Sequence, residues 1–342
     1  MSQTKGKILI AAFGGIESLL EGIRSKINRW RWGREISLEE HSMPTKNAES
    51  KSATGGPGRV SFLDGRGELP MVEVNSPTST AGIYLHGAHV THFKKKNEPP
   101  LLFLSQCSRF AENEPIRGGI PIIFPWFGPR EGLPQHGFAR LKPWELKESV
   151  PAPDGSVSLR FRLLDCPEAS AFPAFNAEYV VTVSDTLTLE LTVKNLSSQD
   201  ILTFENCLHT YFEIGDINQV SIRGLKGADY LDKVANFARK TETNDAIRIN
   251  SEVDRTYLDT MSTVEIIDPV LKRKIFVEKH GSASTVVWNP WVAKAQQMPD
   301  FGNDEYQRMV CVESGNVASD SIKLPPGETS TLTVKLSSET LG

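Results

Sequence analysis

Two short apolar segments of this chain each carry an isolated acid–base side chain. His209 lies among apolar and aromatic neighbours in TFENCLHTYF, residues 203–212, and Glu313 ends the apolar run MVCVE, residues 309–313. The ordinary pKa values of these side chains are about 6.5 and about 4.3, so near neutral pH one can give a proton while the other takes one. A buried glutamate must be paired or functional, because an unpaired buried charge is costly. His209 and Glu313 are therefore the candidates for general acid–base chemistry.

Alternation along an extended strand places these side chains on polar faces. On residues 203–212, one face would be formed by Glu205, Cys207, His209 and Tyr211. On residues 309–313, Cys311 and Glu313 would share a face in the same way. Each side chain also has a purely structural interpretation, because a strand histidine commonly packs with a hydrogen bond and a strand-end glutamate commonly pairs with an arginine. Arg117 and Arg140 are available as such partners.

The segment of residues 115–140, PIRGGIPIIFPWFGPREGLPQHGFAR, has the composition of a substrate-binding site. Its prolines and glycines exclude a helix, and it is too apolar for a solvated loop. A few polar side chains within apolar and aromatic surroundings are typical of small-molecule sites. The polar residues are Arg117, Gln135, His136 and Arg140.

The two arginines of this segment favour an anionic ligand. An arginine fork matches two phosphate oxygens at once, and the glycine pair after Arg117 would let a ligand approach the backbone closely. If HGFAR is extended, His136 and Arg140 share a face. The alternative is that both arginines form structural ion pairs within the fold.

The other histidines and the cysteines do not indicate a metal site. His86, His89 and His92 are three residues apart, but IYLHGAHVTHF alternates like a strand, which sends the middle ring to the opposite face. The four cysteines are far apart and include no CxxC pair, so we expect neither a zinc site nor a disulfide framework. Reduced thiols of this kind are typical of a cytoplasmic or organelle-stromal protein.

The chain after residue 58 is predicted to be β structure. Short segments with period-two alternation recur there, separated by turn sequences such as LDGRGE and LPPGE. So many strands without a long amphipathic helix predict a large antiparallel sandwich or barrel, and the lack of a linker-like break makes residues 58–342 one domain. The predicted strands are residues 59–63, 71–75, 82–93, 101–104, 157–163, 179–183, 186–194, 201–213, 219–223, 246–249, 264–267, 274–279, 285–288, 306–312, 321–323 and 331–336.

Residues 1–57 are interpreted as a flexible extension outside this domain. Apolar residues recur at helical spacing between Ile16 and Trp30, which predicts one short amphipathic helix, and a linker-like segment follows. The functional alternative is an organelle transit peptide or a membrane-surface helix. Glutamates in the segment argue against a transit peptide, since such peptides are poor in acidic residues. We expect a cytoplasmic protein, or a stromal one of a plastid or another organelle if the extension is a transit peptide.

Composition argues against several other classes of protein. The chain has 342 residues and a formal net charge of −4, and no basic patch with interleaved aromatic residues marks a nucleic-acid site. No apolar run reaches the roughly 20 residues that a membrane-spanning helix needs. The motifs of nucleotide-binding loops, zinc proteases and serine hydrolases do not occur in the sequence.

Five segments together resemble the glucose-6-phosphate 1-epimerases, which are the hexose-6-phosphate mutarotases of the aldose 1-epimerase superfamily. They are RGGIPIIFPWFGP, LPQHGFAR, LHTYF, VWNPW and CVESGNV, in the family's order, and the resemblance runs from about Ile83 to about Leu336. It implies an all-β, galactose-mutarotase-like antiparallel β-sandwich with an open cleft, without a metal or an organic cofactor. We also expect a monomer with a hexose 6-phosphate as its substrate and no nucleic-acid partner.

The resemblance also implies roles for individual residues. The catalytic histidine of the family matches His209, and its catalytic carboxylate matches Glu313. The residues that match substrate contacts are Arg117, Gln135, His136, Arg140 and, in the short motif VDRTY, Asp254. In the implied reaction, the C1 hydroxyl loses a proton to Glu313, the ring oxygen gains one from His209, and the opened ring then closes on the other face. Arg117 and Arg140 are the hypothesised phosphate clamp.

Two other functions stay open on the sequence alone. A mutarotase for unphosphorylated aldoses would use the same acid–base pair, and the sequence does not place the arginines at the 6-position of a sugar. A sugar-phosphate-binding or regulatory module without turnover would keep the fold. Such a module would have no use for both His209 and Glu313.

Overall fold

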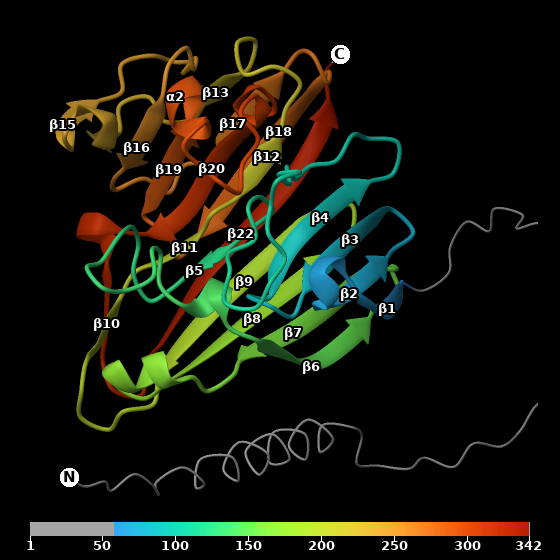
Figure 1. Ribbon diagram of the computed structural model, residues 1–342, viewed down its shortest axis with the longest axis vertical. Coiled ribbons are helices and arrows are strands. Elements are labelled where there is room, and N and C mark those ends of the chain that lie inside the picture. The colour runs from blue at the N-terminus through green and yellow to red at the C-terminus, as the bar shows by residue number, and fades with distance from the viewer. Residues whose placement is uncertain (1–57, 342) are drawn as a thin grey trace, which may run out of the picture. The chain divides into compact units, whose positions relative to one another are not determined.

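The computed structural model describes residues 58–341, and this part of the chain is almost entirely β structure (Figure 1). Its strands form two eight-stranded sheets, a four-stranded sheet and a two-stranded sheet. All pairings between these strands are antiparallel, so the predicted all-β architecture is confirmed. The predicted extension of residues 1–57, with its amphipathic helix, lies outside the described residues.

One eight-stranded sheet, which we call the site sheet, carries most of the candidate functional residues. Its strand order is β15-β14-β16-β19-β20-β11-β5, and β12 also pairs with β20. The strands are β5 (Ile122–Ile123), β11 (Asn206–Leu208), β12 (Tyr211–Glu213), β14 (Asp229–Asp232), β15 (Ala238–Thr241), β16 (Val253–Tyr257), β19 (Ser284–Asn289) and β20 (Met309–Asn316).

The other eight-stranded sheet, which we call the backing sheet, has the order β13-β17-β18-β22-β9-β8-β7-β6. Its strands are β6 (Trp144–Pro151), β7 (Val157–Leu163), β8 (Phe175–Val183), β9 (Leu187–Asn195), β13 (Ser221–Arg223), β17 (Val264–Asp268), β18 (Arg273–His280) and β22 (Thr329–Thr340). In β9 every second side chain is buried, as expected for an antiparallel sheet with one face on the core.

Smaller elements complete the described chain. The four-stranded sheet contains β1 (Arg59–Asp64), β2 (Pro70–Asn75), β3 (Ser79–Tyr84) and β4 (His89–Lys95), and the two-stranded sheet contains β10 (Leu202–Phe204) and β21 (Ile322–Leu324). The described α-helix is α2 (Trp291–Ala295). The 3-10 helices are η2 (Arg66–Glu68), η3 (Ala139–Leu141), η4 (Pro167–Ala171), η5 (Lys233–Ala235), η6 (Glu305–Arg308) and η7 (Ala318–Asp320). Within residues 58–341, no helix has the length and apolar character needed to cross a membrane.

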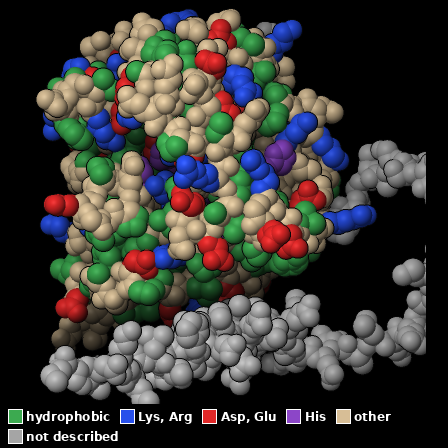
Figure 2. Space-filling view, viewed as in Figure 1, with side chains coloured by type: hydrophobic (Ala, Val, Ile, Leu, Met, Phe, Trp, Pro, Cys, Tyr) green, Lys and Arg blue, Asp and Glu red, His purple; other side chains and the backbone are tan. Residues whose placement is uncertain are grey.

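One apolar cluster joins the two large sheets and the four-stranded sheet. Its members include Val72 of β2, Leu191 of β9 and Val312 of β20, all without exposed surface. Strand β20 is buried at every position because both of its faces are covered. Val312 faces this cluster, whereas Cys311 packs in a second cluster with Tyr211. On the face seen in Figure 2, basic and acidic side chains are interspersed among apolar ones.

Two of the predicted strands are wrong because the chain changes direction or partner. Residues 82–93 form a hairpin, since Gly87 and Ala88 adopt positive φ angles of 74° and 43° between β3 and β4. Residues 201–213 form three strands, since β10 pairs with β21, β11 with β20 and β5, and β12 with β20. Residues 101–104 and 246–249, also predicted as strands, form only isolated bridges.

The hairpin also places His86 between β3 and β4, whereas His89 and His92 lie on β4. The three histidines therefore do not alternate along one strand as predicted. The Nε2 atoms of His86 and His89 lie 2.8 and 2.7 Å from backbone carbonyl oxygens, and that of His92 lies 3.1 Å from a threonine hydroxyl. Each ring thus has its own partner in the fold. The three histidines are not among the groups of potential metal ligands in the described part of the chain.

Candidate active site

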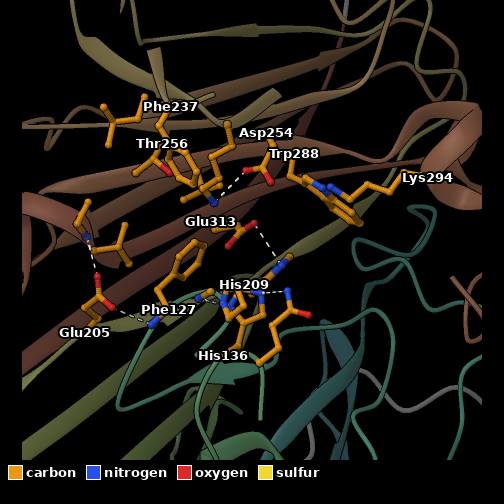
Figure 3. A pocket seen from close by; sticks show the side chains of 18 of the residues that line it. Phe127, His136, Glu205, His209, Phe237, Asp254, Thr256, Trp288, Lys294 and Glu313 are labelled. Atoms are coloured by element: carbon orange, nitrogen blue, oxygen red, sulfur yellow. Dashed lines mark hydrogen bonds and ion pairs between the residues drawn. The ribbon is translucent and has the colours of Figure 1, made fainter. Parts of the chain in front are cut away.

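A cavity of about 610 Å³ lies on one face of the site sheet (Figure 3). Its walls come from β12, β14, β16, β19 and β20, together with the loop of residues 127–136. The volume is within the range of roughly 300–1,000 Å³ that is typical of small-molecule sites. The cavity is therefore large enough for one sugar.

Cross-strand register places the floor residues side by side. In one row the successive neighbours are Leu231 of β14, Thr256 of β16, Val286 of β19 and Glu313 of β20. In the next row they are Asp254 of β16, Trp288 of β19, Cys311 of β20 and Tyr211 of β12. Side chains of both rows share a sheet face, since alternate residues of a strand point the same way. Register thus brings Asp254 and Glu313 into one cavity although they are distant in sequence.

His209 and Glu313 meet at this floor. Nε2 of His209 lies 3.3 Å from Oε1 of Glu313, and the residues are 7% and 1% exposed. His209 sits where the chain passes from β11 to β12, and its ring stacks on Tyr211 with a centroid distance of 4.7 Å. The thiol of Cys207 donates a hydrogen bond of 3.6 Å to the other carboxylate oxygen of Glu313. The two predicted acid–base residues therefore form one oriented pair that faces the cavity.

His136 and Gln135 belong to the part of the cavity wall that the loop of residues 127–136 forms. His136 has a φ of 66°, a conformation that is uncommon for a residue other than glycine and that clusters at functional sites. Its Nδ1 accepts a hydrogen bond of 3.1 Å from the backbone N–H of Gly128, and its ring centroid lies 5.7 Å from that of His209. The prediction that HGFAR is extended is wrong, because Gly137 also has a positive φ and residues 139–141 form η3.

The two predicted arginines occupy different environments. Arg117 lies in the cavity wall, with Nε and Nη2 at 3.2 and 3.1 Å from Oδ2 of Asp300 and Nη1 donating a 3.0 Å hydrogen bond to the Tyr211 hydroxyl. Arg140 is buried outside the cavity lining and donates from Nη2 to the Gln135 carbonyl oxygen at 2.8 Å. The arginine that lines the cavity thus has the structural ion pair considered above. The contact of both arginines with a phosphate stays a prediction.

The glycine pair after Arg117 has a role that differs from the predicted one. A Cβ on Gly118 would lie 2.5 Å from the Phe103 carbonyl oxygen, and a Cβ on Gly119 would lie 2.3 Å from that of Val90. The close approach that these glycines permit is therefore made by neighbouring backbone. The expectation that a ligand approaches there is wrong.

Comparison with known proteins identifies the family. The family model described as aldose 1-epimerase matches residues 70–337. The chain belongs to the aldose 1-epimerase family. A protein of Cenchrus ciliaris, described as a candidate glucose-6-phosphate 1-epimerase, is 39% identical over 258 residues, which cover 72% of this chain and 78% of that protein. A protein of Escherichia coli K12 with the same description is 36% identical over 260 residues, covering 75% and 86%.

Two solved structures agree with this fold. The candidate mutarotase YeaD from Salmonella typhimurium has a TM-score of 0.76 and 31% identity, covering 82% of this chain and 94% of that chain. The structure of the protein HI1317 has a TM-score of 0.68 and 28% identity, covering 82% and 100%. The predicted galactose-mutarotase-like β-sandwich is thereby confirmed.

Several cavity residues of this aldose 1-epimerase family member were not predicted. Lys233 pairs with the predicted Asp254 at 3.0 Å, and Trp288 and Phe237 line the cavity without an assigned role. Trp288 lies in VWNPW, one of the five family segments, so the sequence held a signal for it. Lys233 follows a short strand in YLDKV and looks there like any surface lysine.

Glu205 was placed on the polar face with His209. It lines the cavity, and its hydrogen bonds connect two chain segments of the cavity wall. Its carboxylate oxygens accept hydrogen bonds from the backbone N–H groups of Phe127 at 2.9 Å and Ala318 at 2.8 Å. Phe127 begins the loop of residues 127–136 and Ala318 begins η7, and both residues line the cavity. We therefore interpret this carboxylate as structural.

One set of potential metal ligands occurs among residues 58–341. The donor atoms of His209, Cys311 and Glu313 lie within 4.8 Å of one another, and all three residues are buried. Burial raises the pKa of the Cys311 thiol and of the Glu313 carboxyl well above their usual values, so a metal ion would have to displace protons to bind there. The expectation of a metal-free site stays a prediction.

Burial also governs the protonation of the His209–Glu313 pair. Desolvation lowers the pKa of His209 well below its ordinary value, and the charges of His136, Arg140 and Arg117 lower it further. Desolvation raises the pKa of Glu313 well above its ordinary value, against the attraction of Lys233. Both shifts favour the neutral forms of the two side chains, a neutral imidazole beside a protonated carboxyl.

The rate of sugar mutarotation by this pair should depend on pH in a defined way. Catalysis needs one proton on the His209–Glu313 pair. Activity is therefore lost on the acid side, where His209 is protonated and the pair holds two protons. Because its pKa is lowered, this loss should be centred below about pH 6.5, the ordinary histidine value. The pH dependence of kcat/KM for free glucose, which carries no titrating phosphate, measures this limb. A loss centred at or above that pH would contradict the assignment.

Proposed function

We propose that residues 58–342 are one catalytic domain that interconverts the α and β anomers of a hexose 6-phosphate, in particular glucose 6-phosphate. The observation that carries this proposal is the 3.3 Å contact between Nε2 of His209 and Oε1 of Glu313 at the floor of a sugar-sized cavity. Membership of the aldose 1-epimerase family and two relatives described as candidate glucose-6-phosphate 1-epimerases support the choice of reaction and substrate. A monomeric state and a cytoplasmic or stromal location stay predictions.

The pair can act on the two oxygens that share C1 of the sugar. Glu313 takes the proton of the C1 hydroxyl while His209 gives a proton to the ring oxygen, so the bond between C1 and the ring oxygen breaks and an aldehyde forms. After rotation about the C1–C2 bond, the ring oxygen attacks the other face of the aldehyde and both protons return. No proton is gained or lost over the cycle.

This step needs the ionised form of the His209–Glu313 pair, in which the imidazole is protonated and the carboxyl is not. One proton transfer within the pair produces it from the neutral form. The proton passes from Glu313 to His209 across their 3.3 Å contact without exchange with solvent. A sugar hydroxyl that donates a hydrogen bond to the carboxylate favours its charged form. The Cys207 thiol, whose pKa burial raises well above its usual value, stays protonated and donates to the same carboxylate.

Four other side chains of the lining are proposed to hold the sugar hydroxyls: Arg117, Gln135, His136 and Asp254. Burial lowers the pKa of His136 well below its ordinary value, so the ring is neutral. Its Nδ1 accepts from the backbone, so Nε2 carries the proton, and the side-chain amide of Gln135 lies 3.1 Å from that Nε2. Arg140 supports this wall from behind through the Gln135 carbonyl oxygen.

Exchange spectroscopy by NMR with the purified protein tests the function. Exchange between the α and β signals of glucose 6-phosphate should be much faster with protein than without, and free glucose should exchange more slowly at equal concentration. Faster exchange of glucose than of its phosphate would indicate an aldose mutarotase. Binding of glucose 6-phosphate without faster exchange would indicate a non-catalytic binding module, and either result contradicts the proposal.

A further inference from the structure

Cys311 is a buried thiol beside the acid–base pair, and the proposed mechanism gives it no role. It lies two residues before Glu313 on β20 and therefore on the same, cavity-facing side of the strand. Register places it between Trp288 of β19 and Tyr211 of β12, which both line the cavity. The residue has no exposed surface, so its thiol is protected from bulk solvent but lies next to the reacting groups.

The donor atoms of His209, Cys311 and Glu313 have the spacing of a metal site, since all lie within 4.8 Å of one another. Nε2 of His209 and Oε1 of Glu313 are 3.3 Å apart (Figure 3). Nitrogen and oxygen ligands of a tetrahedral zinc ion are about 3.3–3.4 Å apart, so this pair already matches one edge of the coordination tetrahedron. A sulfur ligand lies about 3.6 Å from the other two, so the thiol has to move by at most about 1.2 Å.

The types of these donors favour zinc over harder divalent ions. Thiolate and imidazole ligands suit Zn²⁺, whereas Mg²⁺ prefers carboxylate, carbonyl and water oxygens. Zinc also binds at sites with three protein ligands and a fourth position that stays open. Here the fourth position would face the cavity, because His209 and Glu313 both line it. A water molecule or a sugar oxygen can fill that position.

The charges of the site permit a divalent ion. The Cys311 thiol and the Glu313 carboxyl each release one proton to solvent when the metal binds, and the resulting thiolate and carboxylate balance the two positive charges of Zn²⁺. The cations Arg117 and Lys233 are each paired with an aspartate, at 3.1 and 3.0 Å, so their charges are largely balanced as well. The loaded site would therefore carry no net charge on its three ligands and the metal.

The surroundings of His209 favour a metal ion that binds reversibly. Its Nδ1 is buried and has no hydrogen-bond partner within residues 58–341. A histidine in a permanent metal site almost always donates from its second ring nitrogen to an acceptor, which strengthens the bond to the metal. The second oxygen of Glu313 does have a partner, the Cys207 thiol at 3.6 Å. We therefore expect an ion that dissociates rather than a resident cofactor.

We propose that His209, Cys311 and Glu313 form a site at which Zn²⁺ binds reversibly and stops catalysis. The ion binds Nε2 of His209 and Oε1 of Glu313, the two atoms between which the catalytic proton moves. With both atoms bound to the metal, the pair can neither take the C1 proton nor protonate the ring oxygen. The loss of activity rests on the proposed function, whereas the binding of the metal does not.

Metal binding is tested on the purified, metal-free full chain with zinc and cobalt as probes. The wild type should take one zinc ion from a chromophoric chelator, and with cobalt it should show the charge-transfer absorption of a cobalt–thiolate bond. Cys311→Ser should raise the Kd for zinc by at least about 100-fold and abolish this absorption, because a hydroxyl is a much weaker ligand than a thiolate. Cys107→Ser, which removes an exposed thiol, should match the wild type in both measurements.

Inhibition is measured by NMR exchange of glucose 6-phosphate, at free zinc concentrations that a metal buffer fixes. Zinc should inhibit the wild type and Cys107→Ser, and the same concentrations of Mg²⁺ should not. Cys311→Ser should stay active without metal and should need at least about 100-fold more zinc for the same inhibition. Circular dichroism checks that this variant is folded, and Cys311→Ala replaces it if it is not. A chelator should leave the wild-type rate unchanged.

The outcomes separate the metal site from the proposed function. A wild type that binds no zinc, or a Cys311→Ser variant that binds zinc and cobalt as the wild type does, would overturn the site. Zinc bound through Cys311 without a loss of activity would overturn the inhibition, and so would a loss of activity on chelation. If the wild type exchanges neither glucose 6-phosphate nor glucose, the proposed function fails, and the binding measurements still decide whether the metal site exists.

Discussion

Replacing Glu313 by Gln should lower the rate of glucose 6-phosphate mutarotation by about 100-fold or more. The amide has nearly the same shape as the carboxyl, so the β20 packing around this fully buried side chain is kept. It cannot take the proton of the C1 hydroxyl, and the Cys207 thiol contact alone does no acid–base chemistry. NMR exchange rates at saturating substrate measure the loss.

His209→Ala should cost a similar factor, because the two side chains work as one pair. For the same reason, the double variant of His209→Ala and Glu313→Gln should be little slower than the slower single variant. Glu278→Gln, a change at a partly exposed position on β18 of the backing sheet, is the control. Rates like those of the wild type in both single variants would overturn the assignment.

Arg117→Met should lower the free energy of unfolding by about 3–5 kcal/mol. The substitution leaves the carboxylate of Asp300, a residue only 7% exposed, without the guanidinium that contacts it at 3.1 and 3.2 Å. An unpaired buried charge is more costly than the absence of the pair. Urea denaturation followed by circular dichroism measures the change.

The double variant of Arg117→Met and Asp300→Asn is the matched control for this prediction. It removes both charges, so it should recover part of the stability that the single variant loses. A single variant within about 1 kcal/mol of the wild type would show that the Arg117–Asp300 pair is not a buried structural ion pair.

Local patterns in the sequence predict the strands well where one face meets the core. In β9, buried leucines and valines alternate with more exposed residues, so the period-two signal is complete. The prediction fails at residues 201–213, where the chain passes from pairing with β21 to pairing with β20 and is interrupted between β11 and β12, without a break in its apolar pattern. Partner exchange depends on strands distant in sequence, so a local pattern does not contain it.

The candidate site is predicted only in part for the same reason. His209 and Glu313 stand out as isolated ionisable groups in apolar segments, but their contact depends on the pairing of β11 and β12 with β20. Lys233 gives no such signal, because its place in the cavity lining and its ion pair with Asp254 depend on the fold. HGFAR is not extended as predicted, because the chain turns at Gly137, and Arg140 therefore lies outside the cavity lining.

A crystal structure with bound glucose 6-phosphate tests the central claim most directly. The account predicts one pyranose in the cavity, with its C1 oxygen about 2.6–3.2 Å from a carboxylate oxygen of Glu313 and its ring oxygen within the same distance of Nε2 of His209. A sugar bound elsewhere, or bound in the cavity with C1 turned away from both side chains, would contradict it.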